Sequence, residues 1–450
     1  MQHIQGISRH QLQMSSLEDK ITADNPVRFI DAFVNHIDPV KIGFQPKILK
    51  TEGRPNFRLE VFLKLYLYGY LNGVRSSRRL EKECFRNIEV QWLLEAIYPN
   101  YHSIADFRKD NPKALKQLFK LFVSFLKDAE LIAGDTIAID GTKSRAHNSK
   151  KANYNQKKID KHKAYIDAKS QEYLDQLEQN DIQENPVVIK NIQQKIEGLK
   201  QNKIKYELLE EELKNSGEPQ ISTTDADARA LLVQGQVVEV SYNIQAAVDS
   251  KHNLVVATHT INRNDKNALA AIALEVKENL ALETFTVLVD KGYHNGRELH
   301  TCKQNNITTI VAVPEQGKSN ENGTQPEYLV SKFIYNKENN SYTCPEGKTL
   351  TTTGSWHKKT GRTEESGYNF QKYRTPACKT CLVKDLCTSR NGGREIDRSQ
   401  YADAVEENHQ RYKDNPQLYR KRQEINEHIF GTIKRKWGYN YTDLVGLEKV

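Results

Sequence analysis

Cysteine is scarce in this sequence, with six residues in a chain of 450. So few thiols in so long a chain do not make a disulfide framework, which indicates a reducing compartment. No apolar run approaches the roughly 18 residues that a membrane span needs, and the polar segment 1–19 lacks the apolar stretch of a signal peptide. We therefore expect a cytoplasmic protein that does not enter a membrane.

The charge balance is basic, with 66 Lys and Arg against 58 Asp and Glu, a formal net charge of +8. Such a balance suits a partner that carries phosphates, although it also occurs in proteins that bind none. The length leaves room for roughly two or three domains. Composition alone therefore favours a nucleic-acid partner without establishing one.

Three carboxylates stand in settings that suit a metal site. Asp140 follows the apolar run Thr-Ile-Ala-Ile, and Asp290 follows Phe-Thr-Val-Leu-Val, so each is expected at the end of a strand. Glu427 lies in a basic stretch, 419–434, with a helical pattern. Hard divalent cations prefer oxygen ligands, and a two-metal phosphoryl-transfer site clamps both the attacking and the leaving oxygen. Gly141 and Gly292 would let backbone or ligand come close to the two aspartates.

Each of these acids also has an ordinary structural interpretation. An Asp after a strand is commonly a turn former or a helix cap, and Glu427 could form ordinary ion pairs on a solvated helix. Residues seven apart on a helix share a face, which groups Glu427 with Arg420 and Lys434. Arg422, five residues before Glu427, points elsewhere on this geometry. Glu424, one turn earlier, competes for the same role.

Residues 1–130 are predicted to form a helical N-terminal domain. Apolar residues recur at helical spacing over 58–71, and a second helix begins near Ser76. The Ser-x-x-Asp pattern at 103–106 predicts the start of a Lys-rich helix that reaches residue 131. Short helices with basic ends resemble a helix-turn-helix unit that binds DNA, here through Arg75, Arg78 and Arg79. A plain helical bundle with a solvated basic face is the alternative.

Residues 131–450 are predicted to form an α/β domain with a mixed sheet and two insertions. Strands are expected over 237–248, 254–261, 284–289 and 307–313, with a helix over 267–282. Without the insertions, this is an RNase H-like order in which the strands of Asp140 and Asp290 are neighbours. The first insertion, 147–220, is predicted to be a helical hairpin, broken at 180–186. It is either a structural arm or, through its basic root with Lys143 and Arg145, a phosphate contact.

The second insertion, 314–400, is poor in apolar residues and contains four of the cysteines. Cys344, Cys378, Cys381 and Cys387 could form a tetrahedral zinc site that stabilises a loop-rich segment too small for its own core. A reduced, metal-free set is the alternative. Cys84 and Cys302 are expected to be buried core thiols.

Three sequence blocks resemble a known family. Ile-Asp-Gly-Thr-Lys-Ser-Arg-Ala (139–146), Val-Asp-Lys-Gly-Tyr-His-Asn (289–295) and Glu-His-Ile-Phe-Gly-Thr-Ile-Lys (427–434) are similar to the acidic blocks of bacterial insertion-sequence transposases of the DDE class. The set Tyr419, Arg422, Glu427 and Lys434 resembles that family's Tyr-Arg-Glu-Lys signature, with one more residue between Arg and Glu. Gly-Arg-Pro (53–55) resembles the start of the family's helical domain, and the cysteine insertion also fits.

The resemblance implies a transposase that cuts double-stranded DNA at the ends of its element and joins the ends to target DNA. Asp140, Asp290 and Glu427 would then hold Mg²⁺ or Mn²⁺, while Lys434 and Arg422 would contact phosphate near the cut. A homodimer on DNA is implied by analogy. Similar proteins continue beyond 446–450 into another helix, so the alternative is a truncated or catalytically impaired DNA-binding protein. A third possibility is an RNase H-like nuclease that does not join strands.

Overall fold

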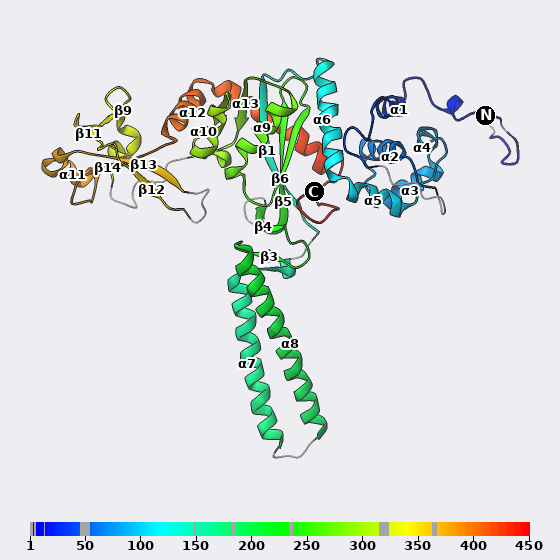
Figure 1. The fold of residues 1–450 in the computed structure, drawn as a ribbon, viewed down its shortest axis with the longest axis horizontal. Coiled ribbons are helices and arrows are strands. Elements are labelled where there is room, and N and C mark those ends of the chain that lie inside the picture. Colours follow the sequence, from blue (N-terminus) through cyan, green and yellow to red (C-terminus); the bar gives the residue numbers. More distant parts are fainter. Residues whose placement is uncertain are drawn as a thin grey trace. The chain divides into compact units, whose positions relative to one another are not determined.

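The protein is described by a computed structural model that covers residues 3, 6–12, 14–45, 55–147, 150–181, 186–233, 237–314, 324–361 and 367–450 (Figure 1). It divides into two compact units, and each is described by itself. The first unit comprises Met1–Leu126, Arg145–Ala228 and Ile433–Val450, and the second comprises Lys127–Ser144 and Arg229–Thr432. Among the described residues, no helix is both long and apolar enough to cross a membrane.

The N-terminal region is helical, as predicted. It contains η1 (Glu18–Lys20), α1 (Pro26–His36), α2 (Leu59–Leu71), α3 (Ser77–Arg86), α4 (Ile88–Leu93), α5 (Tyr101–Asp110) and α6 (Pro112–Asp128). Apolar side chains from these helices form one core, in which Leu63, Leu80 and Ile104 are almost fully buried. The stacked rings of Phe44 and Phe107 extend this core beyond the helices. Two residues of the Gly-Arg-Pro block, 53 and 54, lie outside the described residues.

The predicted helix from 103 to 131 is in fact two helices. The first begins at Tyr101, because the side chain of Asn100 accepts a hydrogen bond from the backbone N–H of Ser103 and caps the helix. Asn111 then leaves the helical conformation, and Pro112 starts α6. A proline disfavours the helical conformation in the residue before it, so the break follows from the sequence.

The predicted helical hairpin is present as α7 (Gln156–Asp181) and α8 (Pro186–Ser216). At its base, the short strand β2 (Asn153–Tyr154), which directly follows η2 (Lys150–Ala152), pairs antiparallel with β3 (Ile221–Ser222). A small core at the base packs Tyr154 and Ile159 against Leu209 and Leu213. The helical hairpin is therefore fixed at its base by this strand pair and this small core.

The second unit is built on a six-stranded mixed sheet. It contains β1 (Thr136–Arg145), β4 (Arg229–Val233), β5 (Val237–Asp249), β6 (Val255–Ile261), β7 (Phe285–Val289) and β8 (Ile307–Val311). The order is β4-β5-β1-β7-β8, and β6 also pairs with β5. β1, β7 and β8 are parallel, whereas β5 and β6 are antiparallel. Ser250 donates to the carbonyl of Thr136 while Gly141 lies against Gln245, so β1 and β5 also run in opposite directions.

This order confirms the RNase H-like arrangement expected from the sequence. η3 (Asp265–Asn267) and α9 (Leu269–Asn279) connect β6 to β7, and η4 (Lys291–Tyr293) and α10 (Gly296–Gln304) connect β7 to β8. Helix α9 packs on β5 and β6, and α10 packs on β8. Strand β4 was not predicted; it pairs in register with β5, from Arg229 opposite Ser241 to Val233 opposite Val237.

The cysteine-containing segment is a second six-stranded sheet. The described part contains η6 (Pro326–Tyr328), η7 (Val330–Lys332), β9 (Ile334–Asn336), β10 (Ser341–Thr343), β11 (Thr349–Thr351), β12 (Trp356–Lys359), β13 (Tyr368–Arg374), η9 (Pro376–Thr380), α11 (Lys384–Cys387) and β14 (Glu395–Ser399). The prediction of a loop-rich segment without its own core is wrong. Tyr342, Leu350, Tyr373 and Ile396 are buried together, and the tyrosine rings pack edge to face, so a few large aromatic side chains suffice for a small core.

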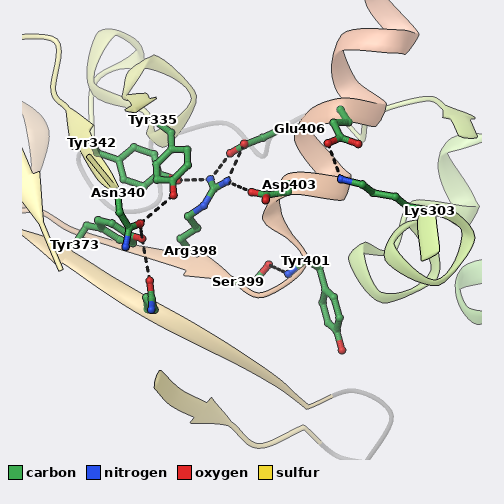
Figure 2. Close-up of polar contacts among 12 residues, drawn as sticks. Lys303, Tyr335, Asn340, Tyr342, Tyr373, Arg398, Ser399, Tyr401, Asp403 and Glu406 are labelled. Carbon is green, nitrogen blue, oxygen red and sulfur yellow. Dashed lines mark hydrogen bonds and ion pairs between the residues drawn. The ribbon is translucent and has the colours of Figure 1, made fainter. Parts of the chain in front are cut away.

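Arg398 connects this second sheet to the following helix, α12 (Ala402–Asp414) (Figure 2). Its guanidinium lies over the ring of Tyr335, 3.6 Å from the ring centroid, and donates to the hydroxyl of Tyr342. From α12, Asp403 and Glu406 form ion pairs with the same guanidinium. The side chain of Arg398 is only 7% exposed, so two carboxylates compensate a buried charge and anchor the sheet to α12.

The last helix of the second unit, α13 (Pro416–Gly431), packs on the mixed sheet. Its buried Ile425 lies in a cluster with Ala138 of β1, Leu288 of β7 and Ile310 of β8. A short π-helix, η10 (Thr432–Lys436), follows α13. The regular α-helical spacing therefore ends at Gly431.

Candidate active site

Two of the predicted acids lie side by side at one edge of the mixed sheet. β1 and β7 are parallel and pair Thr136 with Thr286 and Ala138 with Leu288. Extended by two residues, this register brings Asp140 opposite Asp290. Asp290 directly follows β7, whereas Asp140 lies within β1, which continues to Arg145, so the expectation that Asp140 ends its strand is wrong. The two acids are still neighbours at the carboxyl end of β7, and such strand ends are where α/β folds commonly bind ligands.

A glycine N–H binds each of the two carboxylates. The backbone N–H of Gly141 donates to Asp140 Oδ1 at 2.8 Å, and the N–H of Gly292 donates to Asp290 Oδ1 at 2.7 Å. Asp290 thereby caps η4. The second oxygen of Asp140 faces Arg422 of α13.

The electrostatics at Asp140 favour a cation. Burial raises the pKa of the Asp140 carboxyl to about 6, and repulsion from Asp290 and Asp265 acts in the same direction. The Gly141 N–H and the guanidinium of Arg422 oppose this rise. A half-buried group of like charges is relieved by a positive ion, and carboxylate oxygens are the ligands that Mg²⁺ and Mn²⁺ prefer. The chemistry of Asp140 and Asp290 therefore fits a divalent cation.

Arg422 is the residue of α13 that reaches Asp140. Side chains alternate along a strand, so Asp140 leaves β1 on the same face as Ala138, which packs against Ile425. Arg422 Nη1 lies 3.6 Å from Asp140 Oδ2, and its side chain is 13% exposed. Arg422 and Glu427 do point in different directions, as the sequence predicts. The contact of Arg422 with Asp140 was not predicted from the sequence.

Glu427 is exposed on α13, and so is its competitor Glu424. The buried face of the helix is formed by Ile425 and Asn426. Glu427 and Lys434 do not share a face of one α-helix, because α13 ends at Gly431 and Lys434 lies in the π-helix. Across the described part of the chain, no three His, Cys, Asp or Glu side chains are grouped so as to hold a metal ion. The third acid is therefore not assembled with the two aspartates.

A carboxylate that the sequence analysis missed lies close to both aspartates. Asp265, at the start of η3, acts on Asp140 electrostatically and approaches both glycines that follow the acids. Two features of the sequence could have indicated it. The polar run 262–267 follows the strand 254–261 directly, and strand β5 contains two large amide residues, Asn243 and Gln245, among apolar neighbours.

The basic residues predicted to bind DNA lie in several settings. In the second unit, Lys143 Nζ forms an ion pair with Asp265 Oδ2 at 3.1 Å. In the first unit, the side chain of Arg145 is exposed, while its backbone N–H donates to Asn440 and its carbonyl accepts from Thr442. Lys434 is half-buried in the π-helix.

The three arginines near the start of α3 differ among themselves. Arg75 lies between the rings of Tyr439 and Tyr441, with its guanidinium carbon 4.3 and 4.7 Å from the two centroids. It also donates to the carbonyl of Gly438. Arg78 and Arg79 are exposed, and Arg78 lies over the ring of Tyr101. Arg75 thus has a packing role within the first unit, whereas Arg78 and Arg79 face solvent.

The four cysteines of the second insertion line one small pocket, together with apolar groups that include Phe333 and Val383. All four are free thiols. Burial raises the pKa of Cys387, and the other three cysteines act on it electrostatically. The backbone N–H of Lys348 donates to Cys344 Sγ at 3.2 Å. Four thiols around one pocket suit a soft metal, although their sulfur atoms are not drawn together as ligands.

The remaining two cysteines are in the core, as predicted. Cys84 and Cys302 are both buried, and burial raises the pKa of each thiol to about 12. Such thiols stay protonated at neutral pH and are poor metal ligands or nucleophiles.

Two family models match this chain. One, described as a Transposase domain (DUF772), matches residues 15–110, and the other, described as a Transposase DDE domain, matches residues 343–450. The first covers most of the helical N-terminal region. The second covers much of the cysteine-containing sheet, helix α12 and helix α13 with Glu427, whereas Asp140 and Asp290 lie outside both matches. No curated protein and no solved structure gave a match. Together with the RNase H-like sheet order, these two matches support an insertion-sequence transposase of the DDE class.

Proposed function

We propose that this transposase cleaves double-stranded DNA at the ends of its element and joins the freed 3′-hydroxyls to target DNA. The observation that carries the proposal is the β1–β7 register, which sets Asp140 beside Asp290 at the carboxyl edge of the sheet. The family is one whose members use a divalent metal. A bacterial transposase acts where the DNA is, so we place the protein in the cytoplasm.

Asp140 and Asp290 would hold Mg²⁺ or Mn²⁺, which when bound activates the attacking oxygen and stabilises the leaving one. Arg422 and the N–H of Gly141 hold the Asp140 carboxylate in place and favour its charged form. The N–H of Gly292 fixes one oxygen of the Asp290 carboxylate. These contacts leave the two acids preorganised as oxygen donors at the sheet edge.

Glu427 is proposed as the third acid on the strength of its sequence block and of the match that covers α13. Its exposure means that the carboxylate meets bulk water and not the sheet. Glu424 is equally exposed and lies one turn earlier, so it is the natural comparison for any test of this role.

We propose that the DNA backbone is contacted by Lys143, Arg145, Lys434, Arg78 and Arg79. Phosphate contacts from lysine and arginine supply most of the affinity of such proteins and make it dependent on salt. Arg422 is assigned to Asp140 and not to phosphate, because its guanidinium lies at the carboxylate. Two DNA ends must be brought together for transposition, which favours a homodimer on DNA.

The pocket lined by Cys344, Cys378, Cys381 and Cys387 is proposed as a structural zinc site. Zinc with four thiolates is tetrahedral, with Zn–S distances of about 2.3 Å, so binding would draw the four sulfur atoms together. Ligand thiols lose their protons when zinc binds, so binding should weaken as the pH falls. The role of the metal would be to stabilise the second sheet, away from the acids.

The experiment that tests the proposed function uses the full chain and a labelled duplex carrying the terminal repeats that flank its coding region. With Mg²⁺, the protein should cut at the repeat end, leave a 3′-hydroxyl and join that end to a second duplex, and EDTA should stop both steps. Cutting without joining would identify a nuclease that does not transpose. Binding without cutting would identify a DNA-binding protein that no longer acts as an enzyme.

A further inference from the structure

A buried polar network lies next to the middle of strand β1, which carries Asp140. Asp265 Oδ1 accepts hydrogen bonds from Asn243 Nδ2 at 2.7 Å and from Gln245 Nε2 at 2.9 Å. Asp265 Oδ2 is paired with Lys143 Nζ at 3.1 Å. Asn243 and Gln245 are completely buried. Both oxygens of Asp265 are therefore engaged, and the carboxylate could bind a metal only by giving up these contacts.

The network also reaches the turn that follows Asp290. The hydroxyl of Tyr293 donates to Gln245 Oε1, and the tyrosine is completely buried. This bond fixes which end of the Gln245 amide faces Asp265, so the amide nitrogen is the donor to the carboxylate. Burial raises the pKa of Tyr293 well above its usual value, and the hydroxyl therefore remains a donor.

Glycine at position 141 is required by this arrangement, and Gly292 lies close to it. A Cβ atom on Gly141 would lie 2.3 Å from Gln245 Nε2 and 2.6 Å from Asp265 Oδ1. A Cβ atom on Gly292 would lie 2.9 Å from Asp290 Oδ1 and 3.8 Å from Asp265 Oδ2. A side chain at position 141 would therefore collide with Gln245 and Asp265. One at position 292 would collide with the carboxylate of Asp290 and meet Asp265 only at ordinary contact distance.

Lys143 shares the face of β1 that carries Gly141, because both are an odd number of residues from Asp140. The side chain of Lys143 is 19% exposed, and that of Asp265 is 22% exposed. A long lysine side chain with one such partner is restrained at the sheet edge instead of moving freely in solvent. Asp265 is itself restrained by two buried amides, so it is a rigid anchor for the ammonium.

We propose that Asp265 is a positioning residue for DNA cleavage, which holds the Lys143 ammonium at the sheet edge of Asp140 and Asp290 for contact with a phosphate oxygen of bound DNA. The inference rests on the proposed function. An ammonium carries three N–H donors, so it can contact a carboxylate and a phosphate at the same time. The lysine then binds the backbone beside the acids and sets the position of the phosphate to be cut.

The test measures DNA affinity of the full chain at several salt concentrations in EDTA, so that no cleavage occurs. The proteins are wild type, Lys143→Met, Asp265→Asn and the double variant. Loss of one phosphate contact flattens the plot of log affinity against log salt by about 0.9 on duplex DNA. We expect this flattening in each single variant, and the same value of about 0.9 in the double variant.

The sign of the Asp265→Asn effect separates positioning from simple electrostatics. Removing a carboxylate near DNA reduces repulsion, so without a positioning role the variant binds as tightly as wild type or more tightly. Asp31→Asn is the matched control, since Asp31 is paired with the lysine Lys64 at 2.6 Å in another half-buried ion pair. It should leave the salt slope unchanged. Lys143→Arg keeps a cation for Asp265 and should keep most of the slope.

Three results would overturn the inference: a wild-type slope in Lys143→Met, a wild-type or steeper slope in Asp265→Asn, or a doubled flattening in the double variant. If Asp265→Asn does not fold, a wild-type slope in Lys143→Met still overturns it. Cleavage by the wild-type protein with Mg²⁺ distinguishes failure of this inference from failure of the proposed function. If wild type cleaves and the slopes disagree, only the inference fails; if wild type neither binds nor cleaves, the proposed function fails with it.

Discussion

Replacing Gly141 by alanine should damage both the stability of the second unit and its activity. The added Cβ atom would lie 2.3 Å from Gln245 Nε2, 2.6 Å from Asp265 Oδ1 and 2.8 Å from Asn243 Oδ1. All three are ends of side chains, which are normally easy to move. Here they are buried or half-buried and bonded to one another, so none can move alone.

The loss of stability in Gly141→Ala can be estimated from the side chains that the added Cβ atom displaces. Overpacking a well-packed interior costs about 1–3 kcal/mol. Displacing the Gln245 amide also weakens its bonds to Asp265 and Tyr293, each with a net contribution of about 1 kcal/mol. We therefore expect Gly141→Ala to lower the free energy of unfolding by about 2–5 kcal/mol. Asp140 is the adjacent residue, and a displacement of about 1 Å at the site lowers the rate on the order of a hundredfold.

Urea unfolding followed by circular dichroism measures the first effect, and cleavage of a labelled repeat-end duplex in Mg²⁺ measures the second. Gly198→Ala in α8 is the matched control, because a Cβ atom there meets nothing within 4 Å. In a helix interior, alanine is favoured over glycine by about 1 kcal/mol, so the control should be neutral or slightly stabilising. A Gly141→Ala protein that matches wild type in unfolding and cleavage would refute the packing described for Asp265.

Three further predictions address other parts of the molecule. Glu427→Gln should abolish cleavage while Glu424→Gln retains it, as measured on the same duplex; the reverse result would move the third acid one turn back. Purified protein should contain about one zinc per chain by metal analysis under reducing conditions, since four thiolates make one tetrahedral site; Cys378→Ser with Cys381→Ser should release it, and zinc-free wild type would exclude the site. Arg75→Ala should lower stability by about 1–3 kcal/mol, through loss of its contacts with two tyrosine rings, without changing the salt dependence of DNA binding. Arg78→Ala with Arg79→Ala should instead flatten that dependence by about 0.9 per arginine, and an unchanged slope would mean that both are only solvated.

The order of the mixed sheet could be predicted because five of its six strands have a clear local sequence pattern. Runs such as 284–289 and 307–313 combine β-branched residues with polar ends. The helix over 267–282 separates the strand 254–261 from the strand 284–289. The parallel pairing that joins Asp140 and Asp290 then follows from the few ways in which such units connect. Strand β4 was missed because it is short and becomes a strand by pairing with β5.

The arrangement of side chains around the acids was harder to predict. The partner of Asp140 on α13 depends on which helix face packs on the sheet, and Ile425 decides this by contacting Ala138 and Leu288. A helical period alone cannot distinguish that face from the one with Glu427. Asp265 was missed for the same reason, because its contacts with Lys143, Asn243 and Gln245 join residues 20 to 122 positions apart in the chain.

The second sheet shows that low apolar content does not exclude a hydrophobic core. Its low apolar content suggested loops, yet Tyr342 and Tyr373 bury enough surface to form a core with Leu350 and Ile396. Tyrosine counts as polar in many such assessments, although its ring is a large apolar surface with a single polar end. Arg398 adds an anchor that only the folded chain reveals, since its carboxylate partners come from the helix that follows the sheet.

The central claim is that Asp140 and Asp290 act together as one metal-dependent cleavage site, and the most direct test is a cleavage cycle on Asp140→Ala, Asp290→Ala and the double variant. Groups that act as a unit are not additive. Loss of one ligand should lower Mg²⁺-dependent cleavage on the order of a thousandfold, since the metal contributes several kcal/mol at the reacting phosphate. The double variant should lose no more than the single ones, and all three should bind the duplex as well as wild type does. Wild-type cleavage by either single variant would contradict the account.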